Sequence, residues 1–202
     1  LNADVGDNSV VITVSDGNGG SVTDTFTIAV ANTNDAPTIT SSAVTTATED
    51  VAYTYTVTAA DVDSGDTLTM TGTTVPSWAT FTASTGVLAG TPLNADVGDN
   101  SVVITVSDGT ASVTDSFTIA VANANDAPTI TSTAVLTATE DSAYTYTVTA
   151  SDADSDTLTM TGTTVPGWAT FTASTGVLAG TPLNADVGDH SVVITASDGN
   201  GG

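Results

Sequence analysis

Hydrophobic and polar residues alternate with a period of two along much of this chain. In residues 52–58, threonines separate Tyr53, Tyr55 and Val57. Successive side chains of a strand point to opposite faces, so this segment predicts a β-strand whose tyrosine face lies against a core. Further runs predict strands at 38–40, 67–73, 79–82, 87–89, 101–106 and 112–121. No segment has a sustained helical period.

These runs are rich in Thr and Val and are separated by turns of Asp, Gly, Pro and Ser. Seven short strands in about ninety residues predict an all-β fold, an antiparallel β-sandwich of immunoglobulin-like size. Trp78 and Trp168 each follow a proline in Val-Pro-x-Trp-Ala-Thr-Phe. Aromatic rings can form platforms for sugars, but a sandwich with so few large rings needs them inside, so we expect both in the core.

The whole strand pattern returns after about ninety residues. Leu-Asn-Ala-Asp-Val-Gly-Asp begins at positions 1, 93 and 183, and Gly-Val-Leu-Ala-Gly-Thr-Pro begins at 86 and 176. A period of this length is one domain, so a string of near-identical sandwiches is expected. The phase assigns residues 1–34 to the last two strands of a preceding repeat, 35–125 to a complete repeat, and 126–202 to a second repeat lacking its final strand.

The unpaired edges predicted for the first and last segments allow two interpretations. In one, the chain is a window on a longer array. In the other, residues 21–33 of one chain supply the final strand of repeat 126–202 in the next. Donor and acceptor would then be different surfaces, so this arrangement would grow head to tail into a filament.

Charge narrows the class of partner. The 202 residues include 23 acids and no Lys or Arg, which gives a formal net charge of -23. No carboxylate can therefore be neutralised by a salt bridge to a Lys or Arg of the chain. Such a charge disfavours nucleic acid and anionic membranes as partners and favours divalent cations.

The composition also disfavours catalysis. His190 is the only histidine and stands where other repeats have Asn8 and Asn100, so we interpret it as a surface substitution and not as a general base. Without Cys, Lys or Arg, the chain has no thiol nucleophile, no Schiff-base amine and no cationic clamp for an oxyanion. We expect a protein that is not an enzyme.

Several motifs recur in a fixed order: Asn-Asp-Ala-Pro at 34 and 125, Thr-Glu-Asp at 48 and 139, Asp-x-Asp at 61 and 152, and Gly-Thr-Pro-Leu-Asn-Ala-Asp at 90 and 180. Together they resemble cadherin-type repeats, and are most similar to the dystroglycan-type cadherin-like and putative Ig repeats of bacterial surface proteins and large adhesins. The resemblance implies tandem seven-stranded Ig-like or cadherin-like sandwiches, an extracellular or cell-surface location, and calcium at the junctions between consecutive domains.

The resemblance also implies which residues bind calcium at each junction. At the upstream junction they are Asp4, Asn32, Asn34, Asp35, Asp61, Asp63 and Asp108. At the downstream junction they are Glu49, Asp50, Asp96, Asn123, Asn125, Asp126, Asp152, Asp154 and Asp198. Asn2 and Asn94 stand where the family has Asp, and the lost charge favours one or two ions per junction over three.

Other interpretations of the acids remain open. Asp and Asn are ordinary turn residues. The loops 61–66 and 152–156 are not EF-hand loops, because Gly72 and Thr163 stand where a bidentate Glu is required.

Two functional hypotheses follow. The first is structural: a calcium-rigidified extension region of an extracellular bacterial adhesin or surface filament. The alternative is a calcium-dependent module that binds carbohydrate or further copies of the same repeat. A surface cluster of Trp or Tyr would favour sugar binding, and buried rings would favour the spacer.

Overall fold

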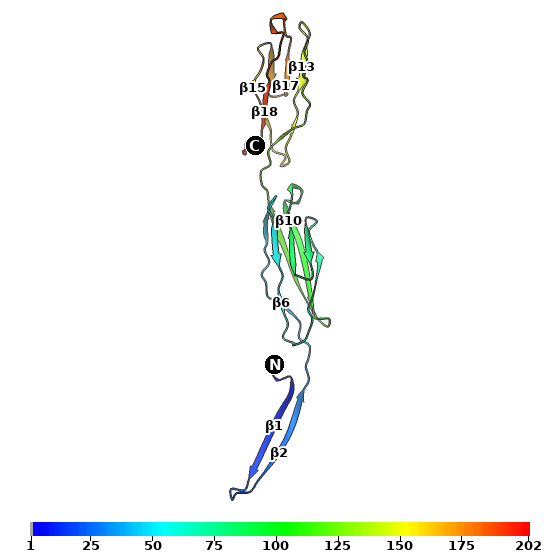
Figure 1. The fold of residues 1–202 in the computed structure, drawn as a ribbon, viewed down its shortest axis with the longest axis vertical. Helices are drawn as coiled ribbons and strands as arrows, with labels where there is room; N and C mark the ends of the chain where they lie inside the picture. The colour runs from blue at the N-terminus through cyan, green and yellow to red at the C-terminus, as the bar shows by residue number, and fades with distance from the viewer. Residues whose placement is uncertain (1) are drawn as a thin grey trace. The chain divides into compact units, whose positions relative to one another are not determined.

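The computed structural model describes residues 2–202, which form strands joined by turns and three short 3-10 helices (Figure 1). The chain divides into unit 1, residues 1–122, and unit 2, residues 123–202. The predicted all-β sandwich fold is confirmed. Among the described residues, no helix has the length and apolar character needed to cross a bilayer.

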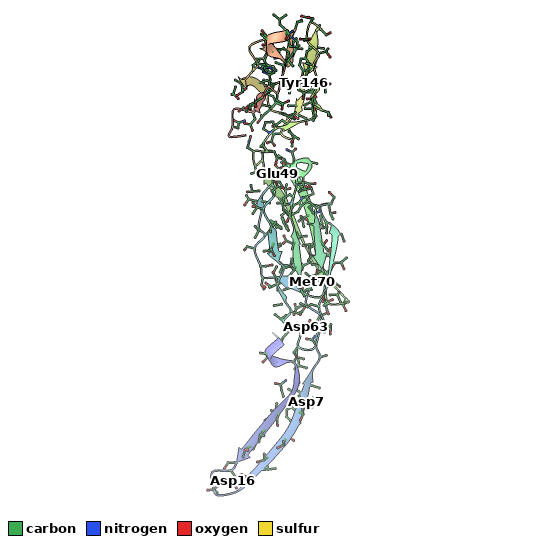
Figure 2. The ribbon with its side chains drawn as sticks, turned by 45° about the horizontal axis from the view of Figure 1, so that its top comes forward. Asp7, Asp16, Glu49, Asp63, Met70 and Tyr146 are labelled. Carbon is green, nitrogen blue, oxygen red and sulfur yellow. The ribbon has the colours of Figure 1, made fainter. Side chains whose placement is uncertain are left out.

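Unit 1 begins with a helix, η1 (Asn2–Asp4), and a long antiparallel hairpin of β1 (Gly6–Ser15) and β2 (Ser21–Val30) (Figure 1). At its turn, Asp16 Oδ1 accepts hydrogen bonds from the backbone N–H groups of Asn18 and Gly20, at 2.8 and 2.9 Å. This carboxylate therefore closes the turn, which lies where Figure 2 labels Asp16.

The rest of unit 1 is a sandwich. Its strands are β3 (Thr38–Ile39), β4 (Thr46–Thr48), β5 (Tyr53–Thr56), β6 (Ala59–Ala60), β7 (Thr69–Thr74), β8 (Ala79–Thr82), β9 (Val87–Gly90), β10 (Gly98–Ser107) and β11 (Ser112–Ala122), with η2 (Asn94–Asp96) before β10. One sheet has the order β4-β11-β10-β7 and another β5-β9-β8, while β3 pairs with β6. The alternating faces of both larger sheets supply the core.

The tyrosine face of β5 lies in that core, as predicted. Tyr53 and Tyr55 are 6% and 4% exposed and pack with Leu88, Ile104 and Ile119, which are fully buried. The Tyr53 hydroxyl donates to the backbone carbonyl of Val44. Burial, and secondly the neighbouring Tyr55, raise the pKa of Tyr53 to about 12.

The strand prediction was wrong in two details. The strand within the run 52–58 is shorter than predicted, because only Tyr53–Thr56 forms β5, which pairs with β9. The sandwich is also not wholly antiparallel, because β4 runs parallel to β11. A three-residue strand of small residues has no apolar alternation of its own, so the pattern could not reveal it.

Unit 2 repeats most of this arrangement. Its elements are β12 (Thr129–Ile130), β13 (Tyr144–Thr147), β14 (Ala150–Ser151), β15 (Thr159–Thr164), β16 (Ala169–Thr172), β17 (Val177–Gly180), η3 (Asn184–Asp186) and β18 (Val193–Ser197). The sheets are β13-β17-β16, β15-β18 and β12-β14. Within the described part of unit 2, no strand corresponds to β11 or β4.

The two tryptophans pack against the cores, as expected, and each is partly buried. Trp78 meets Tyr53 edge to face, with ring centroids 5.6 Å apart, and its Nε1 donates to Asn100 Oδ1 at 3.1 Å. Trp168 packs on Tyr144 in the same way. In place of the asparagine acceptor, Trp168 has the ring of His190 at 6.0 Å, and its buried Nε1 has no hydrogen-bond acceptor within the part of the chain that the structure describes.

His190→Asn should therefore stabilise unit 2 by about 1 kcal/mol, because the new side chain can accept the indole N–H as Asn100 does in unit 1. The free energy of unfolding would be measured with urea, following Trp168 fluorescence in a Trp78→Phe background. The matched control is Asn100→His in a Trp168→Phe background, which should destabilise unit 1. Equal stability of unit 2 with either residue would contradict this account.

A second test compares Ile119 of β11 with Ile28, which holds the same position in the nearly identical strand β2. Ile119 on β11 is fully buried, whereas Ile28 on β2 is 50% exposed. Ile119→Ala should cost about 3 kcal/mol of unit 1 stability, since it removes buried methyl groups and leaves a cavity. Ile28→Ala should change that stability by less than about 0.5 kcal/mol. Urea unfolding followed through Trp78 fluorescence, with Trp168→Phe in both chains, measures the two values; similar losses would count against the burial assigned here.

Candidate metal centres

Each unit gathers three aspartates in the loop that follows its short β6 or β14 strand. Carboxylate oxygens of Asp61, Asp63 and Asp66 lie within 4.8 Å of one another in unit 1. Unit 2 gathers the carboxylates of Asp152, Asp154 and Asp156 in the same way. The loops therefore hold two equivalent acidic clusters.

The first aspartate of each cluster shapes its own loop. Asp61 Oδ1 accepts the backbone N–H of Asp63 at 2.9 Å, and Asp152 Oδ1 accepts that of Asp154 at 2.9 Å. Such side-chain to backbone bonds are typical of Asp in turns. The other oxygens, Asp61 Oδ2 and Asp152 Oδ2, are buried and have no hydrogen-bond partner among the described residues.

The second aspartate is tied to the linker that enters the unit. Asp63 is 6% exposed, and its Oδ2 accepts the backbone N–H of Asp35 at 2.7 Å. The Asp35 N–H, followed by the side chain of Asn32, lowers the pKa of Asp63. In unit 2, the backbone N–H of Asp126 donates to Asp154 Oδ2 at 2.7 Å.

A further aspartate follows the β10 or β18 strand of each unit and bonds to the linker that also contacts the cluster. Asp108 accepts two backbone N–H groups of its own turn, and its Oδ2 accepts Asn34 Nδ2 at 3.0 Å. Asp198 is 8% exposed and accepts Asn125 Nδ2 at 2.8 Å. The N–H groups of Ala111 and Thr110 lower the pKa of Asp108, and Asn125 is the main cause that lowers the pKa of Asp198.

Asp66 behaves in the opposite way. Its pKa is raised, first by desolvation and then by the negative charges of Asp61, Asp63 and Asp108. The unit 1 cluster thus combines Asp63, whose pKa is lowered by hydrogen bonds, with Asp66, whose ionisation its neighbours oppose. No Lys or Arg exists in the chain to relieve that repulsion.

The structure brings most of the upstream set together at this cluster: Asn32, Asn34, Asp35, Asp61, Asp63 and Asp108. Asp4 lies on η1 with an exposed side chain, and it is Asn2 of the same helix that donates to Asp63. Asp66 and its counterpart Asp156 are cluster members that were not predicted from the sequence. Their position, shortly after the Asp-x-Asp motif, was the available signal.

Glu49 and Asp63 lie at opposite ends of the unit 1 sandwich, as Figure 2 shows. Glu49 is 1% exposed, and its N–H donates to the carbonyl of Ala122 at the end of β11. Asp50 has a φ of 58° and donates its N–H to the carbonyl of Pro92, and Asp96 Oδ2 accepts the N–H of Leu93. Three predicted acids therefore come from the turn after β4 and from η2.

The remaining predicted ligands belong to unit 2. Asn125, Asp126, Asp152, Asp154 and Asp198 form the hydrogen-bonded group described above. Asn123 has an exposed side chain, and Asn200, which was not predicted, donates to Asp156 Oδ2 at 2.7 Å. One set of predicted ligands, Glu49, Asp50 and Asp96, belongs to unit 1, and the other is this hydrogen-bonded group of unit 2. That one calcium ion binds both sets remains an expectation.

Two solved structures place the fold among known proteins. The first two ectodomains of human protocadherin-24 are 20% identical over 84% of this chain and 90% of that chain, with a TM-score of 0.53. Domains 1–4 of protocadherin gamma B7 are 20% identical over 98% of this chain and 54% of that chain, with a TM-score of 0.51. These likenesses show the cadherin-like fold and nothing further.

An endo-fucoidan hydrolase, MfFcnA4 of glycoside hydrolase family 107, is 28% identical over 97% of this chain, but the TM-score is 0.42. The chain spans only 32% of the length of that hydrolase, so the likeness carries no argument about activity. No curated protein sequence matches the chain.

The family model described as Putative Ig domain matches twice, at residues 36–122 and 127–202. These matches cover most of the chain and agree with the sandwich geometry of both units. The chain therefore belongs to the Putative Ig domain family, as tandem repeats with a cadherin-like β-sandwich fold.

Proposed function

We propose that this chain is an extension region of an extracellular bacterial adhesin or surface filament, in which calcium bound at the ends of the repeats makes the array rigid. In this proposal, residues 35–125 and 126–202 are consecutive repeats, and residues 1–34 are the last two strands of a preceding one. The chain acts as a spacer and not as an enzyme.

The pair of unpartnered buried oxygens carries the proposal. Asp61 Oδ2 and Asp152 Oδ2 occupy equivalent places and are buried without a hydrogen-bond partner among the described residues. A buried anionic oxygen without a partner is costly. A bound cation at each cluster would remove that cost, and the repetition of the same arrangement in both units supports a common ion.

The donor set favours calcium over other metals. The clusters offer carboxylate oxygens, with Asn and backbone carbonyls near them, and no Cys or His. Zinc prefers nitrogen and sulfur ligands, and magnesium keeps most of its water, whereas calcium accepts six to eight oxygens in flexible geometry. The ligands we assign are Asp61, Asp63, Asp66 and Asp108, and their counterparts Asp152, Asp154, Asp156 and Asp198.

Rigidity would follow from the connection between loop and linker. Asn34 and Asp35 already bond to Asp108 and Asp63, so an ion held by those carboxylates would fix the linker as well. We further assign Glu49, Asp50 and Asp96 of one repeat to the junction with the next. An ion shared in this way would restrict the hinge between repeats.

The aromatic residues support the spacer over the carbohydrate-binding alternative. Tyr53 is buried, and Trp78 packs edge-on against it with its indole N–H already bonded to Asn100. Trp168 packs on Tyr144 in the same geometry. These rings serve the packing of each sandwich and do not form a stacking platform.

Calcium should bind to the wild-type chain and stabilise it, by about 2.7 kcal/mol when free calcium is a hundred times the dissociation constant. The double variant Asp61→Asn and Asp152→Asn should weaken calcium binding by at least about tenfold, because a ligand charge is lost at each cluster. Isothermal titration calorimetry and thermal unfolding with calcium or chelator would measure both effects.

The matched control is Asp7→Asn with Asp99→Asn, which removes the same charge from exposed strand positions outside the clusters. This control should bind calcium as tightly as the wild type. A wild-type chain with no heat of binding and an unchanged unfolding midpoint would refute the calcium proposal, and equal losses in both double variants would reduce it to a general charge effect.

Stiffening requires its own measurement, since calcium could bind without restricting the hinge. Small-angle X-ray scattering of the full chain should show a narrower range of end-to-end dimensions with calcium than with chelator. Glu49→Gln together with Asp96→Asn should reduce this narrowing while leaving the Asp61 and Asp152 clusters intact. Identical scattering in both conditions would leave a calcium-binding repeat without the rigid-spacer role.

A further inference from the structure

The loops that carry the two acidic clusters differ in length. Residues 61–66 of unit 1 read Asp-Val-Asp-Ser-Gly-Asp, whereas residues 152–156 of unit 2 read Asp-Ala-Asp-Ser-Asp, so Gly65 has no counterpart. In unit 1 the positive φ of the loop falls on Gly65, at 110°, and in unit 2 it falls on Ser155, at 63°. A serine has fewer conformations available than a glycine, so the unit 2 loop is the more restricted of the two.

The turn after the neighbouring strand differs in the opposite direction. After β10 the turn reads Asp-Gly-Thr-Ala from Asp108, and after β18 it reads Asp-Gly-Asn-Gly-Gly from Asp198. The shorter cluster loop is thus accompanied by the longer turn. At the third position of the turn, unit 2 has Asn200 where unit 1 has Thr110.

Asn200 gives the unit 2 cluster an amide contact that the sequence of unit 1 lacks. Its Nδ2 donates to Asp156 Oδ2 at 2.7 Å. Thr110 has no amide group, and its backbone N–H donates to Asp108. The third aspartate of each cluster is accordingly placed differently, because Asp156 is half-buried while Asp66 is exposed.

The turn that carries Asn200 takes its shape from its own sequence. The β1–β2 hairpin has the same sequence at residues 16–20, where Asp16 Oδ1 accepts two backbone N–H groups of the turn at 2.8 and 2.9 Å. Asp198 Oδ1 accepts the two equivalent N–H groups at 2.8 and 3.0 Å. In the hairpin, Asn18 Nδ2 bonds to the carbonyl of Asp16 at 3.4 Å. The turn is therefore the same in both places, and its asparagine reaches a carboxylate in the place where an acidic cluster faces it.

We propose that the two calcium sites differ in affinity, and that the unit 2 cluster binds the ion more tightly because Asn200 and the shorter loop hold Asp156 in position. This inference rests on the calcium binding proposed above, and it gives Asn200 the role of a positioning residue. Hydrogen bonds that orient a metal ligand change the affinity by about 10- to 100-fold. A ligand that is already oriented also loses less conformational freedom when the ion binds.

Unequal sites would make the stiffness of the chain depend on calcium in steps. Each cluster is hydrogen-bonded to the linker of its own unit, residues 32–35 in unit 1 and 123–126 in unit 2. As calcium falls, the unit 1 cluster loses its ion first, so its linker is released while the linker of unit 2 stays fixed. The loop and turn of each repeat would then set the calcium concentration at which its linker stiffens.

Isothermal titration calorimetry of the full chain with calcium tests the difference between the sites. Asp61→Asn with Asp63→Asn removes two assigned ligands of unit 1 and leaves the unit 2 site, and Asp152→Asn with Asp154→Asn leaves the unit 1 site. The site that remains in the first chain should have a Kd at least about tenfold lower than the site that remains in the second.

The role of Asn200 is tested in the chain that keeps the unit 2 site. Asn200→Thr installs the unit 1 residue and should raise the Kd by about tenfold. The unfolding midpoint in chelator should not change, because the Asn200 side chain is exposed and acts on the bound state. The matched control is Asn18→Thr, the same change in the same turn of the hairpin, which should leave the Kd unchanged.

A transplant tests the same point by a gain of affinity. In the chain that keeps the unit 1 site, residues 61–66 are replaced by the wild-type sequence of 152–156, and residues 108–111 by that of 198–202. The Kd of this site should fall to that of the unit 2 site, and circular dichroism would check that the strand content is kept.

Equal affinities at the two sites, or tighter binding in unit 1, overturn this inference and leave the calcium-binding function in place. An unchanged Kd in Asn200→Thr, or an equal rise in Asn18→Thr, overturns the role of Asn200 in the same way. A wild-type chain without any heat of calcium binding overturns the inference together with the proposed function.

Discussion

The pairing of β11 with β10 is the interaction on which the unit 1 sandwich depends. Where β11 is present, Val102, Ile104 and Ile119 are buried and β4 forms at the edge of the sheet. Unit 2 has nearly the same sequence without this strand, and there Val192 and Val193 are 41% and 48% exposed. In this chain such segments, which are rich in Thr and individually weak, therefore form strands where a partner strand lies beside them, as β1 and β2 also do.

Electrostatics sets the second constraint. All of the charge is negative, so every loop that gathers carboxylates must satisfy them with N–H groups, amide side chains or an external cation. The clusters use the first two means extensively, through Asp35, Asn34 and the turn N–H groups around Asp108. What these donors do not satisfy, the buried Oδ2 of Asp61 and of Asp152, is the part of each site that is suited to an ion.

Periodicity predicted the fold and most strand positions, because alternation of Tyr, Val and Thr reports which face is buried. It could not predict β4, whose three residues become a strand only through the ladder of β11. The resemblance to cadherin-type repeats located the acidic loops, yet it placed Asp4 where Asn2 makes the contact and omitted Asp66. Such errors arise because a motif gives chain positions, whereas which side chain reaches a cluster depends on the turn that carries it.

The near-identity of β2 and β11 has a consequence for selectivity. Two strands that differ only at one side chain, Thr25 against Ser116, offer a partner strand almost no contact by which to tell them apart. Choice between them must then come from the covalent connection, since a tethered strand is present at an effective concentration of the order of millimolar. In a protein of nearly identical repeats, chain connectivity performs the discrimination that side chains perform elsewhere.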